Sequence, residues 1–260
     1  MTAIAARRRH PMATAALLLL GLLVTGMAYS LAVPHQADGA TASSAGVQAG
    51  HKLFLANCAT CHGRNAEGRG EFPSLVGVGA AAVDFQVGTG RMPLQATGPQ
   101  AGKQPVHFTD EQIEQLAAYV ASLAPGPAVP DAEAVDPTKG DSARGSLIFR
   151  TNCAMCHNFA GKGGALTRGK YAPDLSETTD KHIYEAMETG PQSMPVFTDQ
   201  TVDPETKRDM IAFLYSVREA PSPGGLSLGS LGPVPEGLVG WLLGLGLLIG
   251  ATVWIGAKSS

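Results

Sequence analysis

The chain contains two copies of the motif C-x-x-C-H, and these two copies hold all of its cysteines. Two thiols separated by two residues can each form a thioether to a vinyl group of one porphyrin. The histidine that follows is then placed to ligate the iron. We therefore predict two covalently bound haem c groups. Cysteines 58 and 61 would attach the first and cysteines 153 and 156 the second, and the attachment residues and proximal iron ligands are Cys58, Cys61, His62, Cys153, Cys156 and His157.

Two other uses of paired cysteines fit this sequence less well. A zinc ribbon joins two C-x-x-C pairs that lie much closer in sequence than these two do. A redox-active pair typically lies near a βαβ pattern, and no such pattern surrounds either motif. Neither use explains why a histidine follows both pairs, so haem attachment is the favoured interpretation.

The residues before each motif also repeat. A glycine lies eight residues before the first cysteine in both copies, at Gly50 and Gly145. A phenylalanine lies four residues before it, at Phe54 and Phe149. This spacing places each pair on one face of a helix, with the glycine where another backbone can approach closely. The chain is thus predicted to contain two copies of one small haem-binding domain.

Each copy then continues through a glycine-rich loop to a Met-Pro pair, which supplies a candidate distal ligand. Met92 and Met194 each precede a proline, which fixes the backbone beside the sulfur. Thioether sulfur is a soft donor, and His/Met ligation raises the haem potential into the range of electron carriers. Met187 is a rival, because it follows its motif by as many residues as Met92 does. We expect Met187 to pack from a short helix and Met194 to ligate iron.

The remaining histidines are better interpreted as surface or loop residues than as iron ligands. They are His10, His35, His51, His107 and His182.

Amphipathic and capping patterns predict helices in both copies. Helices over residues 45–57 and 142–152 should lead into the two haem motifs. Thr109 opens a capping box for a later helix of the first copy. In the second copy Asp203 should cap a helix whose first position is Pro204. No run alternates clearly enough to indicate a strand.

The predicted fold class is therefore mostly α, with two tandem cytochrome c domains and a C-terminal transmembrane helix. The domains should span residues 45–124 and 139–220, joined by an extended Pro-rich linker over 125–138. A second linker, 221–236, leads to an uncharged segment at 237–257, roughly twenty residues, which is enough to cross a hydrocarbon core. Aromatic residues near both ends and a following lysine are typical of such spans, and here they are Trp241, Trp254 and Lys258.

Residues 1–36 read as an N-terminal export signal or membrane anchor helix. The cluster Arg7–Arg9 precedes an apolar run over residues 12–33. That run is long for a signal-peptide core and lacks a clean small-x-small site before Pro34, which favours a retained anchor. Either form places the haem domains on the extracytoplasmic face of the cell (plasma) membrane.

The formal net charge of −3 argues against a nucleic-acid partner. The 32 glycines and 18 prolines suit small domains in which loops wrap around a cofactor.

On these motifs, the chain resembles the dihaem cytochrome c subunit of the actinobacterial cytochrome bc complex, the menaquinol–cytochrome c reductase. The resemblance covers nearly the whole chain from about Gly50. Besides the haem motifs it rests on GTGRMP at 88–93, GKGGALT at 161–167, TGPQSMPVF at 189–197 and WIGAKS at 254–259. Single-haem domains occur in many families, whereas the paired domains with this anchor are more specific.

The resemblance implies a role beside a cytochrome b subunit, a Rieske iron–sulfur subunit and a terminal cytochrome c oxidase. Such a subunit takes electrons from the Rieske cluster and passes them through two haems towards the oxidase. The chain would then be an electron-transfer subunit of a quinol–cytochrome c reductase, a translocase. The resemblance implies no independent active site in this chain.

Two alternatives remain. The first is the dihaem subunit of a cbb-type oxidase, against which the C-terminal anchor argues. The second is a dihaem enzyme such as a peroxidase or thiosulfate dehydrogenase, which needs an exchangeable position on one iron. Met92 and Met194 favour two closed, carrier-type haems. Binding of cyanide or carbon monoxide to the isolated reduced protein would distinguish these classes.

Overall fold

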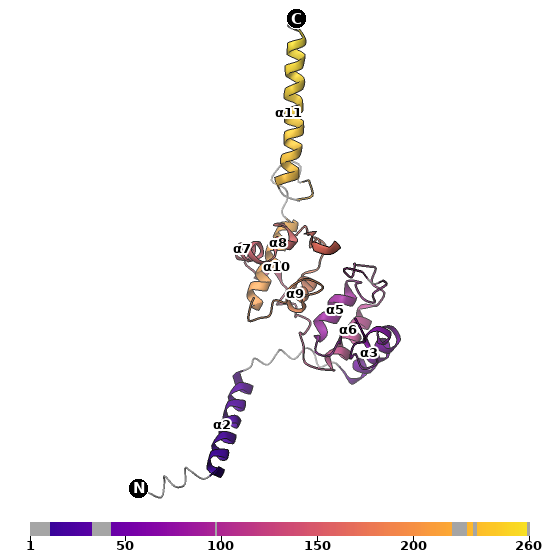
Figure 1. Ribbon diagram of the computed structural model, residues 1–260, viewed down its shortest axis with the longest axis vertical. Coiled ribbons are helices and arrows are strands. Elements are labelled where there is room, and N and C mark those ends of the chain that lie inside the picture. The colour runs from indigo at the N-terminus through magenta and orange to yellow at the C-terminus, as the bar shows by residue number, and fades with distance from the viewer. Residues whose placement is uncertain (1–10, 33–42, 97, 220–227, 231–232, 259–260) are drawn as a thin grey trace, which may run out of the picture. The chain divides into compact units, whose positions relative to one another are not determined.

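The structure is a computed structural model that describes residues 11–32, 43–96, 98–219, 228–230 and 233–258. It divides into one compact unit over residues 1–41 and another over residues 42–260. In the first unit, the apolar helix α2 (Pro11–Ala32) accounts for the expected N-terminal helix (Figure 1). Some predicted features lie outside the described residues: Arg7–Arg9, His10, His35 and most of the linker 221–236.

The second unit begins with four helices, which we call domain 1. They are α3 (Ser44–Asn57), α4 (Ala59–His62), α5 (Gly79–Gly88) and α6 (Asp110–Ala121). The capping box predicted at α6 is confirmed, since Thr109 Oγ1 accepts from the Gln112 amide and the Gln112 side chain accepts from the Thr109 amide. Helix α5 was not expected. Most of its residues are buried, including charged Asp84, so it lacks a polar stripe.

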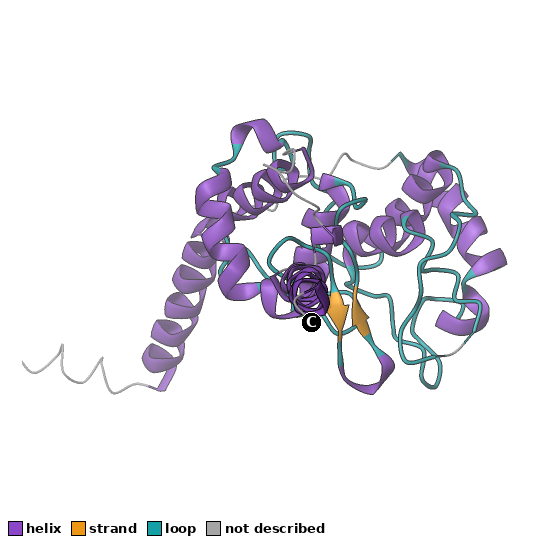
Figure 2. Ribbon diagram, turned by 90° about the horizontal axis from the view of Figure 1, so that it is seen from above, coloured by secondary structure: helices purple, strands orange, loops and turns teal. Residues whose placement is uncertain are grey.

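Domain 2 repeats this order with two additions. Its α-helices are α7 (Ser142–Asn152), α8 (Ala154–His157), α9 (Asp180–Thr189) and α10 (Pro204–Glu219). A short antiparallel pair, β1 (Gly164–Ala165) with β2 (Tyr171–Ala172), is visible in Figure 2 and flanks η2 (Thr167–Gly169). The expectation of no strand is therefore wrong at this hairpin, where two residues a side are too few to show alternation.

In each domain the helix before the haem motif crosses the last helix at a glycine. A Cβ at Gly50 would overlap the backbone carbonyl of Gln115 on α6. A Cβ at Gly145 would overlap the carbonyl of Asp209 on α10. The prediction that these glycines admit a close backbone is confirmed. Side chains of Phe54 and Phe149, each almost fully buried, fill the two cores beside these crossings.

The Pro-rich segment between the domains is not a free spacer. The amide of Ala81 donates to the carbonyl of Pro127 at 3.1 Å, and Gly126 lies directly against the backbone of Gly79. Farther along, Ala134 and Val135 pack against the apolar core of domain 2, and the segment ends in the helical turn η1 (Pro137–Lys139). This stretch therefore contacts both domains along its length.

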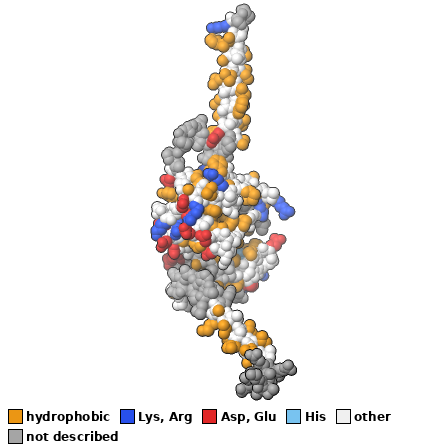
Figure 3. All heavy atoms as spheres, turned by 90° about the vertical axis from the view of Figure 1, so that its left-hand side faces the viewer, with side chains coloured by type: hydrophobic (Ala, Val, Ile, Leu, Met, Phe, Trp, Pro, Cys, Tyr) orange, Lys and Arg blue, Asp and Glu red, His pale blue; other side chains and the backbone are white. Residues whose placement is uncertain are grey.

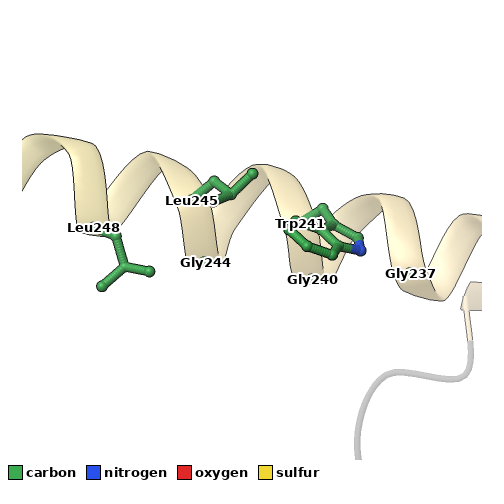
Figure 4. A pocket seen from close by; sticks show the side chains of 6 residues that line it. All are labelled: Gly237, Gly240, Trp241, Gly244, Leu245 and Leu248. Atoms are coloured by element: carbon green, nitrogen blue, oxygen red, sulfur yellow. The ribbon is translucent and has the colours of Figure 1, made fainter.

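The C-terminal helix α11 (Pro233–Lys258) follows the turn η3 (Leu228–Ser230). Among the described residues, Val234–Lys258 is the one helix long and apolar enough to cross a membrane. Exposed hydrophobic side chains lie along most of α11, whereas the haem-motif domains carry charged side chains of both signs on their surface (Figure 3). Three glycines leave a shallow apolar hollow on one face (Figure 4), lined by Gly237, Gly240, Trp241, Gly244, Leu245 and Leu248. The predicted mostly helical fold with a C-terminal apolar helix is confirmed.

Candidate haem-binding sites

Both C-x-x-C-H motifs adopt the same backbone turn. The amide of Cys58 donates to the carbonyl of Phe54 at 2.8 Å, and the amide of Cys153 donates to that of Phe149 at the same distance. The first cysteine thus ends one helix and immediately begins the short helix α4 or α8. Each short helix carries the second cysteine and the histidine. The repeated sequence is therefore a repeated three-dimensional unit, with both thiols and the imidazole within one helical turn and its cap.

The two motif histidines are oriented in the same way. His62 Nδ1 lies 2.8 Å from the carbonyl oxygen of Pro73, and His157 Nδ1 lies 3.2 Å from that of Pro173. A carbonyl can only accept, so Nδ1 carries the proton and Nε2 presents a lone pair. A backbone partner on the far nitrogen is the usual way in which a metal-bound histidine is held. Burial also lowers the pKa of His157, which favours the neutral, ligating imidazole.

The cysteines also fit covalent haem attachment. All four have free thiols and are half-buried, so neither pair forms a disulfide. Burial, followed by repulsion from its partner, raises the pKa of Cys58 to about 11 and that of Cys153 to about 11. Reactive redox pairs instead need a lowered pKa. These thiols are therefore suited to carry a thioether rather than to act as thiolates.

Each predicted distal methionine packs on the same core as its own haem motif. Met92 is half-buried against the apolar cluster that also contacts Cys58, and Met194 is half-buried against the cluster that contacts Cys153. Met187 instead lies within the core on α9 and is only 4% exposed. The structure thus brings Met92 and Met194 to their domains' cores from loops, as the Met-Pro pattern predicted.

The internal repeat also distinguishes Met187 from Met194. Thr89 and Thr189 occupy equivalent positions, because each donates its hydroxyl to the carbonyl four residues earlier at the end of its helix. Two residues before these threonines lie the buried Val87 in domain 1 and Met187 in domain 2, so these two residues are equivalent. Met187 therefore occupies a core position of the repeat, although its separation from the preceding motif had made it a rival of Met194 as the distal iron ligand.

The two proline carbonyls are site residues that the sequence interpretation missed. A shared pattern marks them, since Pro73 and Pro173 each lie two residues before a leucine. The amides of Leu75 and Leu175 donate to the carbonyls of Ala66 and Gly161, at 2.8 and 2.7 Å, and so pin the two loops. A comparison of the two halves for Pro-x-Leu would have found them.

The expectation for the other histidines needs one correction. His51 and His107 are exposed, as expected. His182 instead lies in the first turn of α9, and its side chain is only 14% exposed. It is covered because α9 packs against α5.

Both domains are similar to known protein families. Residues 47–124 match the family model for cytochrome c, and residues 140–214 match that for cytochrome c oxidase, cbb3-type, subunit III. A cbb3-type cytochrome c oxidase subunit from Sinorhizobium medicae is 29% identical over 66% of this chain and 60% of its own length.

The relatives that match nearly the whole chain are named as cytochrome c subunits of the cytochrome bc1 complex. A cytochrome bc1 complex cytochrome c subunit from Corynebacterium efficiens is 44% identical over 96% of this chain and 90% of the relative. The subunit of the same name from Mycobacterium tuberculosis is 44% identical over 97% of this chain and 93% of the relative. With this identity over nearly its whole length, the chain belongs to the family of cytochrome c subunits of the cytochrome bc1 complex.

Proposed function

We propose that this chain is the membrane-anchored dihaem electron-transfer subunit of a quinol–cytochrome c reductase. The observation that carries the proposal is the doubled C-x-x-C-H turn, in which each histidine Nδ1 is held by a proline carbonyl. Relatives named as cytochrome c subunits of the bc1 complex support the assignment to that complex.

Each domain has its own set of residues for one haem. In domain 1, Cys58 and Cys61 would form the two thioethers, and His62 and Met92 would be the proximal and distal iron ligands. In domain 2 the corresponding residues are Cys153, Cys156, His157 and Met194. The bound haem supplies a one-electron iron couple, which His/Met ligation places in the range of electron carriers. The protein residues hold the ligands and exclude water, and the domains 45–124 and 139–220 each form one such site.

The partners follow from the family. We infer that domains 1 and 2 relay electrons from a Rieske iron–sulfur subunit, beside cytochrome b, towards a terminal cytochrome c oxidase. The anchor is α11, which is exposed and apolar along its length. Arg7–Arg9 before the N-terminal helix and Lys258 at the end of α11 support a topology with both ends on the cytoplasmic side and the haem domains outside. This chain works within the reductase and has no active site of its own.

A cbb-type oxidase subunit is the second candidate, because the subunit III model matches domain 2. The relatives that support it align with only part of this chain, however. Purification from membranes discriminates between the two. Cytochrome b and a Rieske protein should copurify, and copurification of cbb-type oxidase subunits alone would support the second candidate. Carbon monoxide binding to the isolated reduced protein would instead indicate an enzyme with an open haem.

Haem content tests the two attachment sites. Pyridine haemochrome analysis together with intact-mass measurement should give two haems per chain. Cys58→Ala and Cys153→Ala should each weaken one attachment and leave the other intact. Native protein that carries no haem, with zinc bound at the cysteines or with four unmodified thiols, would overturn the proposal.

The distal ligands are tested by near-infrared spectroscopy of the oxidised protein. Replacing Met194 with alanine should remove one of two Met–Fe charge-transfer bands and lower the potential of one haem. Met187→Leu is the matched control, because it is close to volume-conserving in a buried apolar position and should keep both bands. The assignment is wrong if the control loses a band and the Met194 variant keeps both.

A further inference from the structure

A cluster of ionisable side chains lies where the two domains touch. Helices α5 and α9, equivalent in the repeat, pack against each other. Asp84 comes from α5, and His182 and Glu185 come from successive turns of α9. One donor atom from each residue lies within 4.8 Å of the other two. Neighbouring contacts hold the domains together here, including a hydrogen bond of 2.9 Å from the Gln100 side chain to the Tyr171 carbonyl.

Two of these three side chains, His182 and Glu185, have buried polar atoms without a partner. His182 Nε2 lies 4.0 Å from Asp84 Oδ1 and 3.9 Å from Glu185 Oε2. The Glu185 side chain is 0% exposed. Neither of its oxygens, nor His182 Nε2, has a hydrogen-bond partner within the described part of the chain. A buried polar group without a partner is destabilising, so three such atoms side by side point to a ligand.

We propose that Asp84, His182 and Glu185 bind a divalent transition-metal cation of the Zn²⁺ type between the two domains. An imidazole nitrogen with two carboxylate oxygens is a donor set that suits zinc, whereas an imidazole is a poor ligand for calcium or magnesium. Zinc lies about 2.0–2.2 Å from such donors, so tetrahedral ligands would be about 3.3–3.6 Å apart. The two separations from His182 Nε2 would shrink by about 0.3–0.7 Å, and that between the two carboxylates, which is at most 4.8 Å, by up to about 1.5 Å. The cation would then be the polar partner that the buried side chains of Glu185 and His182 both lack.

The surrounding charges decide how tightly the cation binds. Lys181 Nζ lies 2.6 Å from Asp84 Oδ2, which leaves Oδ1 to face His182. Its side chain is 42% exposed, so it can remain on the outer oxygen in contact with water. Lys181, Arg91 and Lys103 all place positive charge near His182 and oppose a cation. Two carboxylates in the site neutralise the charge of the ion itself.

Protons compete with the metal at this site. Burial, reinforced by Asp84, raises the pKa of Glu185 to about 9, so this carboxyl is protonated near neutral pH when no cation is bound. Metal binding should displace that proton, as it does at other sites with ionisable ligands. The bound ion would join α5 of one haem domain to α9 of the other.

The test uses the full haem-loaded chain in detergent, freed of loosely bound metal by a chelator. After equilibration with Zn²⁺ and gel filtration, elemental analysis should give one zinc per chain, with the protein concentration taken from amino-acid analysis of the same sample. Glu185→Gln, which preserves side-chain shape, should weaken zinc binding by more than about tenfold. Lys181→Met should tighten it several-fold. Glu177→Gln, at an exposed position, is the matched control and should bind like the wild type.

Amide exchange gives a second measurement. Zinc should slow exchange in α5 and α9 of the wild type and leave it unchanged in Glu185→Gln. Asp84→Asn replaces that variant if Glu185→Gln fails to fold. The proposal is overturned if the wild type binds no zinc, or if it and the ligand variants bind zinc equally. Neither result depends on the number of haems, so the proposed function is tested separately.

Discussion

The two haem-motif domains have the same backbone fold but differ in the side-chain contacts that stabilise the helix crossing within each domain. At the helix crossing of domain 1, the Tyr119 ring stacks on His51 with centroids 4.8 Å apart and packs against Phe54. At the same crossing of domain 2, Phe149 meets Phe213, and the neighbouring contact is ionic. There Arg144 pairs with the buried Asp209 and, at 2.5 Å, with Glu205. In domain 1 the positions equivalent to Arg144 and Asp209 are Ala49 and Gln115.

A second difference lies one half-turn earlier on the last helix. Ile113 is buried in domain 1, and the equivalent residue in domain 2 is Lys207, whose side chain is 0% exposed. Lys207 pairs with Glu188 at the end of α9 and, at 2.7 Å, with Asp199 in the loop after Met194. The comparison shows that both domains keep the glycine, the phenylalanine and the haem motif of the shared fold. The side chains packed around these residues can be apolar, as in domain 1, or charged, as in domain 2.

The largest effect should come from Lys207→Met. This change leaves Glu188 and Asp199 without their buried cation, which should cost domain 2 about 3–5 kcal/mol, at the lower end because Asp199 is 58% exposed. Hydrogen exchange should show faster opening of α9 and α10 and unchanged α3 and α6. Ile113→Met is the control in domain 1 and should cost less than about 1.5 kcal/mol. Adding Glu188→Gln to Lys207→Met should restore part of the loss, and no restoration would contradict the ion-pair explanation.

Next in size are Gly50→Ala and Gly145→Ala. Each adds a Cβ that overlaps a carbonyl on the facing helix, and overpacking of this kind costs about 1–3 kcal/mol. Denaturant titrations followed by exchange should show that each variant destabilises its own domain alone. Gly246→Ala on α11 has open space around the new methyl and should change neither domain. Equal tolerance at all three glycines would mean that the close crossings are not required.

The smallest effect should come from moving the ionic contact into domain 1. Ala49→Arg combined with Gln115→Asp recreates the pair on a similar crossing, but solvent reaches it. Exposed pairs contribute about 0–1 kcal/mol, so the midpoint of unfolding of domain 1 should hardly change. A gain well above that range would show that the charged crossing of domain 2 is a major source of its stability.

The sequence was most informative where chemistry requires particular residue types. The helical turns at the C-x-x-C-H motifs and the capping box of α6 depend on local geometry, and the two glycines at the helix crossings were expected from the repeat. The Met-Pro pattern also led to methionines in loops beside the two cores. The turns and the cap leave a local pattern because their residues are close in the chain, whereas the glycines were recognisable because each lies eight residues before its motif.

Features made by distant segments were not predictable in this way. Helix α5 is buried on several sides, so its sequence lacks the polar stripe that marks an amphipathic helix. The partners of His62 and His157 are backbone carbonyls, which any residue could provide, so only the Pro-x-Leu pattern shared by the two halves could have indicated them. Glu185 looked like an ordinary charged position of a surface helix, and only the packing of α9 against α5 buries it.

The segment between the domains has a consequence for their modularity. Its first residues complete domain 1, because the Pro127 carbonyl accepts the Ala81 amide and Gly126 fills the space beside Gly79. A fragment cut at residue 124 would expose that amide and lose stability, whereas one ending at residue 128 would keep its partner. Recombination between relatives should therefore exchange this domain together with its proline-rich tail. The segment that is exchanged as one unit would therefore extend beyond α6 into the Pro-rich linker.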